Sequence, residues 1–482
     1  MSFKVAFIGA GSIGFTRQIV KDLLSVEEFR NIEISFMDIS EHNLEMVRAL
    51  CQRDIDSNKL SIKIEATTNR KEALKNAKYV FVTVRVGGLE AFATDVEIPL
   101  KYGVDQCVGD TLCAGGIMYG QRGIPVMLGI CSDIKEVARE DCMILNHTNP
   151  NAMITWAANH YGKVPTIGLC HGVQGGHQKI ADVFGLKKEE VDIICAGINH
   201  QTWYTQIRHN GEDLTGKLLD AFLNHEEFSK TEKVRIDMLK RFGYFSTESN
   251  GHLSEYVAWY RKRLDEINDW IDLSTWINGE TGGYLRVCTE KRNWFETDFP
   301  EWMKKDPFVY DKEHRGHEHG SYIIEGLETG RLYRGHFNVV NNGCITNLPD
   351  DAIVEVPGYI DANGVNIPKV GALPLGCAAV CNSSISVQRL AVHAAVEGNE
   401  LLLKQAMMMD PLVGAVLNPN EIWQMTDEML VACEDLLPQY KDVIKAAKER
   451  LLHKEIETDD SFKGAARLKV KTIEELKEEN KK

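Results

Sequence analysis

Short apolar runs alternate with amphipathic stretches along the first third of the chain. The run at residues 4–8 is rich in β-formers and leads through the glycine-rich segment 9–14 into a stretch whose apolar residues recur at helical spacing. A second apolar run at 32–37 ends at Asp38. The pattern therefore predicts a strand, a glycine turn, a helix and a second strand, which together begin a βαβ unit.

This alternation continues to about residue 197. We expect helices over 41–58, 71–76 and 117–134, the last with a local interruption at Pro125, and strands over 60–66, 79–84, 143–146, 164–169 and 191–197. Strands that alternate with helices indicate a parallel sheet with helices on both faces. The first part of the chain is therefore predicted to be an α/β, Rossmann-like doubly wound domain.

From about residue 218 the alternation stops, and the pattern becomes α+β. We expect helices over 230–242, 254–271, 318–328 and 383–409, strands over 337–341 and 352–357, and a polar loop over 243–252 that is dense in catalytic residue types. The last stretch has mixed charge and few aromatic residues. The predicted organisation is a Rossmann-like domain over 1–197, an α+β domain over 198–452 and an exposed helix or mobile tail over 453–482.

Composition narrows the class of protein. Of 482 residues, 44% are hydrophobic and 26% are charged, as in globular proteins. The net charge of −15 argues against nucleic-acid and anionic-membrane partners. We find no signal peptide ahead of the first strand and no apolar run long enough to span a bilayer. Twelve cysteines without a compact framework indicate reduced thiols in a cytoplasm.

The glycine turn has the features of a dinucleotide site. Gly9 allows the tight turn, Gly11 lets a pyrophosphate approach the backbone, and Gly14 allows close packing of helix and strand. Ser12 precedes a helix N-terminus whose N–H groups can bind phosphate. Asp38 is placed to bind a ribose diol, which favours NAD over NADP. The alternative is a glycine turn without a ligand.

Polar residues also follow several of the later strands, where open α/β sheets bind their ligands. Arg85 and the glycines after it end the 79–84 strand, and they either line the cofactor or form a turn. Asn149 precedes a proline at the end of the 143–146 strand, which places its amide in the crevice or in a simple turn. Both readings stay open on the sequence alone.

Cys170 and His200 come directly after two apolar segments. Thiolate and imidazole are common ligands of borderline divalent metals. Because the sequence contains no Cys-x-x-Cys pair, a closed structural zinc site is not indicated. The two residues either form an open metal site completed by substrate and water, or they are packing residues.

Taken together, these motifs resemble glycoside hydrolase family 4, the NAD- and metal-dependent glycosidases, and within it the melibiase-type α-galactosidases. The likeness runs from residue 4 to about residue 440. The segments that carry it are 9–12, 109–116, 149–150, 170–175, 196–200, 243–256 and 356–374.

The resemblance implies a malate- or lactate-dehydrogenase-like fold and a redox-neutral hydrolysis of α-glycosides, with α-galactosides favoured. NAD⁺ takes hydride from C3 of the sugar, a base takes the C2 proton, the aglycone is eliminated, water adds at C1, and the ketone is reduced again. This scheme is an exception to the usual pair of catalytic carboxylates. A divalent metal, usually Mn²⁺, holds the C2 and C3 oxygens. The family likeness also implies a homodimer or homotetramer.

The same resemblance implies roles for individual residues. Cys170 and His200 correspond to the metal ligands, and Asp110 and Asn149 to substrate contacts. His171 follows the metal cysteine, which points to a non-phosphorylated sugar, and it is a candidate to assist departure of the leaving group.

The base that removes the C2 proton is less fixed by the motifs. Family members differ in using a tyrosine or a carboxylate in the matching loop. Glu248 is the first candidate here, with Tyr256 and Tyr244 behind it.

One departure from the family pattern leaves the sugar open. Melibiase-type relatives carry Cys-His-Ser where this chain has Gly172 after His171, and Cys-His-Gly occurs in relatives that act on α-glucuronides. Galactoside, glucoside, glucuronide and galacturonide therefore remain alternatives. Outside the family, the alternatives are an NAD-dependent 2-hydroxyacid or sugar dehydrogenase and a non-catalytic NAD sensor.

Overall fold

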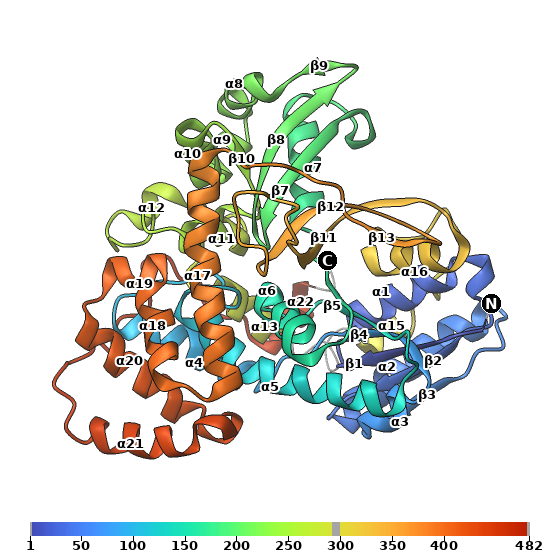
Figure 1. Cartoon of the computed structure of the whole chain (residues 1–482), viewed down its shortest axis with the longest axis horizontal. Coiled ribbons are helices and arrows are strands. Elements are labelled where there is room, and N and C mark those ends of the chain that lie inside the picture. The colour runs from blue at the N-terminus through green and yellow to red at the C-terminus, as the bar shows by residue number, and fades with distance from the viewer. Residues whose placement is uncertain (1, 292–298, 480–482) are drawn as a thin grey trace.

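The computed structural model describes residues 2–291 and 299–479. Within these residues the strands are β1 Lys4–Ile8, β2 Glu33–Met37, β3 Ile64–Thr67, β4 Ala77–Val82, β5 Met143–Asn146, β6 Thr166–Gly168, β7 Asp192–Ile198, β8 Gln201–His209, β9 Glu212–Asp213, β10 Phe245–Ser246, β11 Tyr333–Val340, β12 Ile353–Asp361 and β13 Gly364–Asn366. The described strands form one sheet in the order β10-β8-β7-β12-β11-β6-β5-β4-β1-β2-β3, with β13 beside β12 and β9 beside β8 (Figure 1).

Helices cover both faces of this sheet and build a separate bundle at one side of it (Figure 1). Among the described residues, none of the helices combines the length and apolar character needed to cross a bilayer. The α-helices are α1 Ile13–Leu24, α2 Glu41–Ser57, α3 Arg70–Leu74, α4 Gly88–Lys101, α5 Cys113–Val137, α6 Asn151–Ala157, α7 Gly172–Val183, α8 Leu218–Asn224, α9 Phe228–Thr231, α10 Lys233–Phe242, α11 Asn250–Tyr256, α12 Ile267–Trp270, α13 Gly283–Lys291, α15 Phe299–Trp302, α16 His319–Thr329, α17 Leu375–Glu397, α18 Glu400–Met409, α19 Pro411–Val416, α20 Pro419–Ala432, α21 Lys441–Leu451 and α22 Ile473–Glu479.

The amino-terminal half of the sheet confirms the doubly wound prediction. β3, β2, β1, β4, β5 and β6 lie side by side, and every pairing between them is parallel. This strand order, 3-2-1-4-5-6, is the one that binds dinucleotides at the carboxyl ends of the strands. The sheet therefore brings the ends of β1, β4, β5 and β6 to one edge.

Alternation along β1 produces a core on each face of the sheet. Val5 and Phe7 belong to one buried cluster, which includes residues of α1, α2 and α16. Ala6 and Ile8 belong to the other, which includes residues of α5, α6 and α17. Because successive side chains of a strand point to opposite faces, one five-residue strand contributes to both cores.

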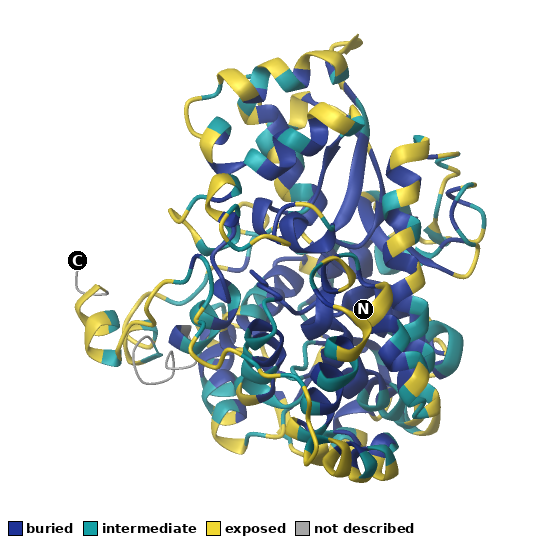
Figure 2. Cartoon of the chain, turned by 90° about the vertical axis from the view of Figure 1, so that its left-hand side faces the viewer, coloured by how far each residue is buried: buried dark blue, intermediate teal, exposed yellow. Residues whose placement is uncertain are grey.

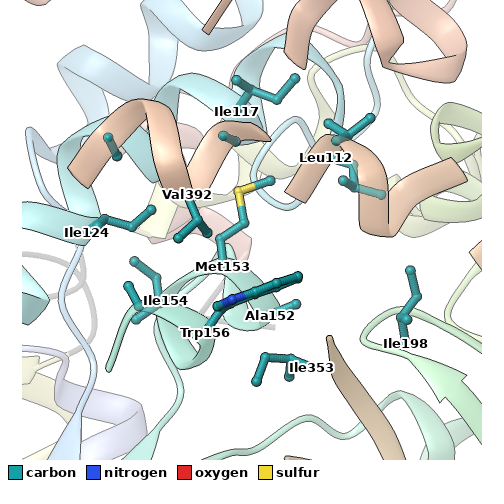
Figure 3. Packing of buried hydrophobic residues seen from close by; sticks show 14 of the residues in the cluster. Leu112, Ile117, Ile124, Ala152, Met153, Ile154, Trp156, Ile198, Ile353 and Val392 are labelled. Atoms are coloured by element: carbon teal, nitrogen blue, oxygen red, sulfur yellow. The ribbon is translucent and has the colours of Figure 1, made fainter. Parts of the chain in front are cut away.

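The core on the α5 side joins the two halves of the chain. Figure 3 shows Met153 and Trp156 of α6 between Ile117 of α5 and Ile353 of β12, with Val392 of α17 alongside. Large apolar side chains from four elements thus pack in one place, each at most 3% exposed. Such burial stabilises by about 1.5–3 kcal/mol per large side chain.

The second half of the sheet is antiparallel and continues from the first. β11 meets β6 at Asn338 and Gly168, and β12 meets β7 at Glu355 and Gly197. β7 and β8 are joined by the two residues Asn199 and His200. The domain boundary that we predict at residue 197 falls inside β7, so the sheet runs across it, and the boundary itself stays a prediction.

Three expected helices differ in the structure. Pro125 lies inside α5 without ending it. The helix expected over 383–409 is two helices, because Gly398 has a left-handed φ of 65° and the side chain of Asn399 caps the start of α18. The helix expected over 254–271 ends at Tyr256, and the chain turns so that buried Arg261 binds Asp105. A tertiary ion pair overrides the local helical pattern there.

The C-terminal segment is held more firmly than the expected exposed helix or mobile tail. The backbone N–H of Ala465 donates to Asp105, and Ala466 exchanges hydrogen bonds with Thr281. Ala466 is 4% exposed and packs with Ile267. Figure 2 shows that α22, beside the C-terminus, is mostly exposed.

Candidate active site

A cavity of about 280 Å³ lies where β5, β6 and β7 end. It gathers residues from segments that are far apart in the sequence. The residues that line it are Phe15, Val108, Asp110, His147, Asn149, Leu169, Cys170, His171, His200, Glu248, His252, Trp276, Ile277 and Tyr284. Six predicted site residues from outside the glycine turn are in this set: Asp110, Asn149, Cys170, His171, His200 and Glu248, the first candidate for the base.

The glycine turn borders this cavity through Phe15 in the first turn of α1. Gly9 has a φ of 90°, and the backbone N–H of Gly11 donates to Asp38 at 2.8 Å. A Cβ atom at Gly11 would lie 2.7 Å from the Asp38 carboxylate, so only glycine fits. Ser12 makes no side-chain cap, which leaves the N-terminus of α1, with Gly14 in its first turn, for a phosphate. These features fit NAD.

Cys170, His200 and Glu248 form a compact donor set. One ligand atom from each lies within 4.8 Å of the others. Cys170 follows β6, His200 has a φ of 61° in the two-residue turn between β7 and β8, and Glu248 lies between β10 and α11. Thiol, imidazole and carboxylate are a donor set that suits a borderline divalent metal.

The orientation of His200 shows which ring nitrogen faces the donor set. Nδ1 lies 3.1 Å from the Thr111 hydroxyl and 3.2 Å from the Tyr256 hydroxyl. Nε2 lies 3.8 Å from Oε1 of Glu248. Hydrogen bonding at one nitrogen of a ligand histidine fixes the other toward the metal. Tyr256 therefore contacts the ring nitrogen of His200 that is turned away from the donor set.

Glu248 is ionised in its surroundings. Burial by itself would raise the pKa of this carboxyl, but His252 and His200 hold the pKa well below its ordinary value. Oε2 of Glu248 lies 2.8 Å from Nδ1 of His252. The sequence did not single out His252, although it stands one helical turn after Glu248.

His171 is paired with a carboxylate that the sequence did not indicate. Its Nε2 lies 3.0 Å from Oε2 of Glu318, just before α16. Burial lowers the pKa of His171, but Glu318 outweighs this and raises the pKa above its ordinary value. Glu318 therefore favours the imidazolium form of His171, which can donate a proton. The dense run of histidine and glutamate at 313–319 is the signal that could have pointed to this pair.

Asp110 and Asn149 are brought together as expected of substrate contacts. Nδ2 of Asn149 donates to Asp110 at 3.1 Å. Arg85 lies 3.8 Å from the same carboxylate and stacks over Phe92 and Tyr284. This contact shows that Arg85 supports Asp110, and its predicted contact with the cofactor stays a prediction.

A buried carboxylate holds the loop that carries Asp110. Glu255 accepts hydrogen bonds from the backbone N–H groups of Cys107, Val108 and Gly109 at 2.7–3.1 Å. No pattern in the sequence indicated this role. Tyr244 and Tyr256, the secondary candidates for the base, are not among the residues that line the cavity.

The parallel sheet, glycine turn and donor set define a nucleotide-dependent α/β enzyme with a metal site. The family model described as Family 4 glycosyl hydrolase matches residues 4–186, and that of the Family 4 glycosyl hydrolase C-terminal domain matches residues 195–413. The chain belongs to glycoside hydrolase family 4.

Individual relatives agree with this membership. The chain is 57% identical to an α-galactosidase of Rhizobium meliloti (strain 1021), over 99% of this chain and 98% of the relative. It is 33% identical to an α-galactosidase of Bacillus subtilis (strain 168), over 91% and 100%. A 6-phospho-α-glucosidase from gut microorganisms, solved with NAD and glucose-6-phosphate, has 27% identity and a TM-score of 0.74, over 91% and 99%.

Proposed function

We propose that this protein is an NAD- and Mn²⁺-dependent glycosidase that hydrolyses α-glycosides of uncharged sugars, α-galactosides first among them. The observation that carries the choice of sugar is the charge of the cavity. Its described lining includes the carboxylates Asp110 and Glu248 and contains neither lysine nor arginine. A uronate or a sugar phosphate would meet negative charge there and no permanent cation to offset it.

Similarity supports the same choice. The relatives with 57% and 33% identity are both named as α-galactosidases. The solved 6-phospho-α-glucosidase is named for a phosphorylated sugar, and a phosphate is commonly bound by arginine or lysine, which the described lining of this cavity does not contain. α-Glucosides, α-galacturonides and α-glucuronides remain the alternatives within the family.

NAD and a divalent metal fit the residues at two adjoining places. The glycine turn and Asp38 would hold NAD, as in the solved relative, and Cys170 and His200 would hold the metal. When bound, NAD supplies reversible hydride transfer, and the metal supplies a Lewis acid that makes the sugar C2 proton removable. Side chains of the protein bind the sugar and transfer the protons.

Four residues act directly on the sugar. Asp110 and Asn149 hold its hydroxyl groups. Glu248, ionised and facing the cavity, accepts the C2 proton on a carboxylate oxygen. His171, charged through Glu318, gives a proton from its ring to the departing glycosidic oxygen.

Other residues position Asp110 and the metal ligand His200. Thr111 and Tyr256 fix the ring of His200, Arg85 supports Asp110, and Glu255 holds the loop on which Asp110 stands. Because these contacts join groups of the protein itself, they hold the site in a fixed geometry for the sugar.

We also propose a cytoplasmic homodimer or homotetramer. A metal-binding thiol needs a reducing compartment, and eleven buried cysteines are free thiols. Sedimentation of the purified protein tests the assembly directly. A monomer at micromolar concentration would contradict it.

Paired nitrophenyl glycosides test the choice of sugar. The purified protein, with NAD⁺, Mn²⁺ and dithiothreitol, is given the α-galactoside, α-glucoside, α-galacturonide, α-glucuronide and 6-phospho-α-glucoside. We expect the α-galactoside to have the highest kcat/KM, with the charged sugars at least about a hundredfold lower, which corresponds to about 2.7 kcal/mol. A preferred uronide or phosphosugar would contradict the proposal.

A further inference from the structure

Gly172 stands where the family resemblance leads us to expect a serine, and the structure shows which contact its small size allows. A Cβ atom added at Gly172 would lie 2.9 Å from Cγ of Glu248 and 3.5 Å from Sγ of Cys170. Cβ atoms in proteins essentially never come within 3.0 Å of another side chain. The carboxylate of Glu248 can therefore reach its observed place only because residue 172 has no side chain.

The surroundings of Glu248 direct it to the donor set rather than to another protein partner. Oε1 lies 3.8 Å from Nε2 of His200. Oε2 is buried and lies 2.8 Å from Nδ1 of His252, which is also 2.7 Å from the Ser249 hydroxyl. A buried carboxylate that faces a thiol and an imidazole, and has no lysine or arginine partner among the described residues of the cavity, has the character of a metal ligand.

We propose that Glu248 is a third protein ligand of the metal in the sugar-free enzyme and that Gly172 is what admits it. Metal bonds to these donor types are about 2.0–2.3 Å long, so two ligands of one ion lie at most about 4.6 Å apart. The mutual separations within 4.8 Å among Cys170, His200 and Glu248 are close to that limit. This inference rests on the proposed metal dependence of the enzyme.

A ligand role for Glu248 gives a reason for Gly172 that does not involve the substrate. Cys-His-Gly in this chain accommodates a carboxylate of the protein itself, so Gly172 is no indication of a uronide substrate. The ligand role and the proton-accepting role of Glu248 belong to two stages. Without sugar the carboxylate would complete the protein's donor set for the metal, and with sugar in the cavity it would be free to take the C2 proton.

The test measures Mn²⁺ affinity without sugar, by electron paramagnetic resonance of free Mn²⁺ in a titration of the protein. Glu248→Gln removes the charged donor, and Gly172→Ser displaces it. Gly175→Ala is the matched control, because Gly175 is on the same helix and a Cβ there meets nothing within 4 Å. We expect the Mn²⁺ Kd to rise about tenfold or more in Glu248→Gln and Gly172→Ser, which is at least the effect of removing a group that hydrogen-bonds to a metal ligand. The Kd of Gly175→Ala should stay unchanged.

A double variant separates displacement of Glu248 from general damage. If Gly172→Ser acts by displacing Glu248, it should raise the Mn²⁺ Kd no further in a Glu248→Ala background. A second loss of similar size there would overturn the role given to Gly172. If Gly172→Ser does not fold, the Mn²⁺ affinity of Glu248→Gln decides the ligand role, provided that this variant melts at the same temperature as the wild type.

Measuring both Mn²⁺ affinity and glycoside turnover distinguishes failure of this inference from failure of the proposed function. Unchanged Mn²⁺ affinity in folded Glu248→Gln, with α-galactoside turnover lost, would overturn the ligand role and leave the glycosidase intact. Weakened Mn²⁺ binding in an enzyme that cleaves no glycoside would support the ligand role and contradict the function.

Discussion

At the scale of single residues, the chemistry depends on side chains whose charge is set by their neighbours. Glu318 raises the pKa of His171, while His252 and His200 lower the pKa of Glu248. The pKa values of the proposed acid and the proposed base are thus shifted in opposite directions inside one cavity. Two groups whose surroundings separate their pKa values are the expected arrangement for acid–base work.

Loss of the metal thiol is the first prediction at this scale. In Cys170→Ser, a hydroxyl replaces the soft ligand, so Mn²⁺ affinity should fall by more than the roughly 10–100-fold caused by loss of an outer-shell partner. Turnover of the α-galactoside should be abolished. NAD⁺ binding, followed by calorimetry, should stay unchanged because the glycine turn is untouched. Retained turnover would remove Cys170 from the metal site.

The His171–Glu318 pair leads to a prediction about pH. Glu318 raises the pKa of His171, so the imidazolium is present below that pKa and is lost as the pH rises through it. In Glu318→Gln the alkaline limb of kcat should move to lower pH, and kcat at neutral pH should fall by about 10²–10⁴-fold with a poor leaving group. Nitrophenyl substrates, which need little protonation, should lose much less. Equal losses for both leaving groups would contradict the proton-donor role.

The sequence predicted some of these residues because they stand at strand ends. Parallel strands finish at one edge, so Asn149 and Cys170 had to lie near each other. Glu318 and Glu255 could not be predicted, since each reaches its partner across more than a hundred residues of chain. A linear pattern carries no signal for such a contact.

At the scale of elements, the sequence pattern predicted a helix or strand correctly where the period of its apolar residues agrees with its packing in the fold. The parallel strands were predicted to within a few residues because they are buried on both faces. The strand β8 was missed, and the helix over 254–271 was wrong because Arg261 is drawn to Asp105. Tertiary partners decide the structure of such segments.

The break between α17 and α18 provides a prediction for one element. Gly398 has a φ of 65°, and a Cβ there would lie 2.4 Å from the carbonyl oxygen of Gln439. Gly398→Ala should therefore lower the free energy of unfolding by about 2 kcal/mol or more. Gly216→Ala is the control, since a Cβ there meets nothing within 4 Å. Chemical denaturation measures both, and equal stability of the two variants would contradict the strain assigned to Gly398.

At the scale of the whole molecule, one continuous sheet places the dinucleotide turn and the donor set on the same cavity. The C-terminal segment adds a contact at long range. Ala465 binds Asp105, five residues before Asp110, and Lys471 donates its backbone N–H to Glu290. The segment therefore supports the loop that carries a substrate contact.

Removal of this segment is the prediction for the whole molecule. A chain ending at Lys463 leaves the Asp105 carboxylate without one of its donors and uncovers Thr281. We expect a loss of about 1–3 kcal/mol in the free energy of unfolding, the usual cost of such a buried group, and a higher KM for the α-galactoside. Truncation after residue 472, which removes only α22, is the control. Identical KM and stability in the two truncations would contradict the supporting role.

The central claim is that hydrolysis proceeds through reversible removal of the sugar C2 proton. The direct measurement is cleavage of nitrophenyl α-galactoside in D₂O with NAD⁺, Mn²⁺ and dithiothreitol, followed by mass and proton spectra of the released galactose. We expect one carbon-bound deuterium at C2, no net NADH, and no cleavage when NAD⁺ or Mn²⁺ is left out. Galactose without deuterium at C2, or cleavage without NAD⁺, would contradict the mechanism and leave an ordinary hydrolase.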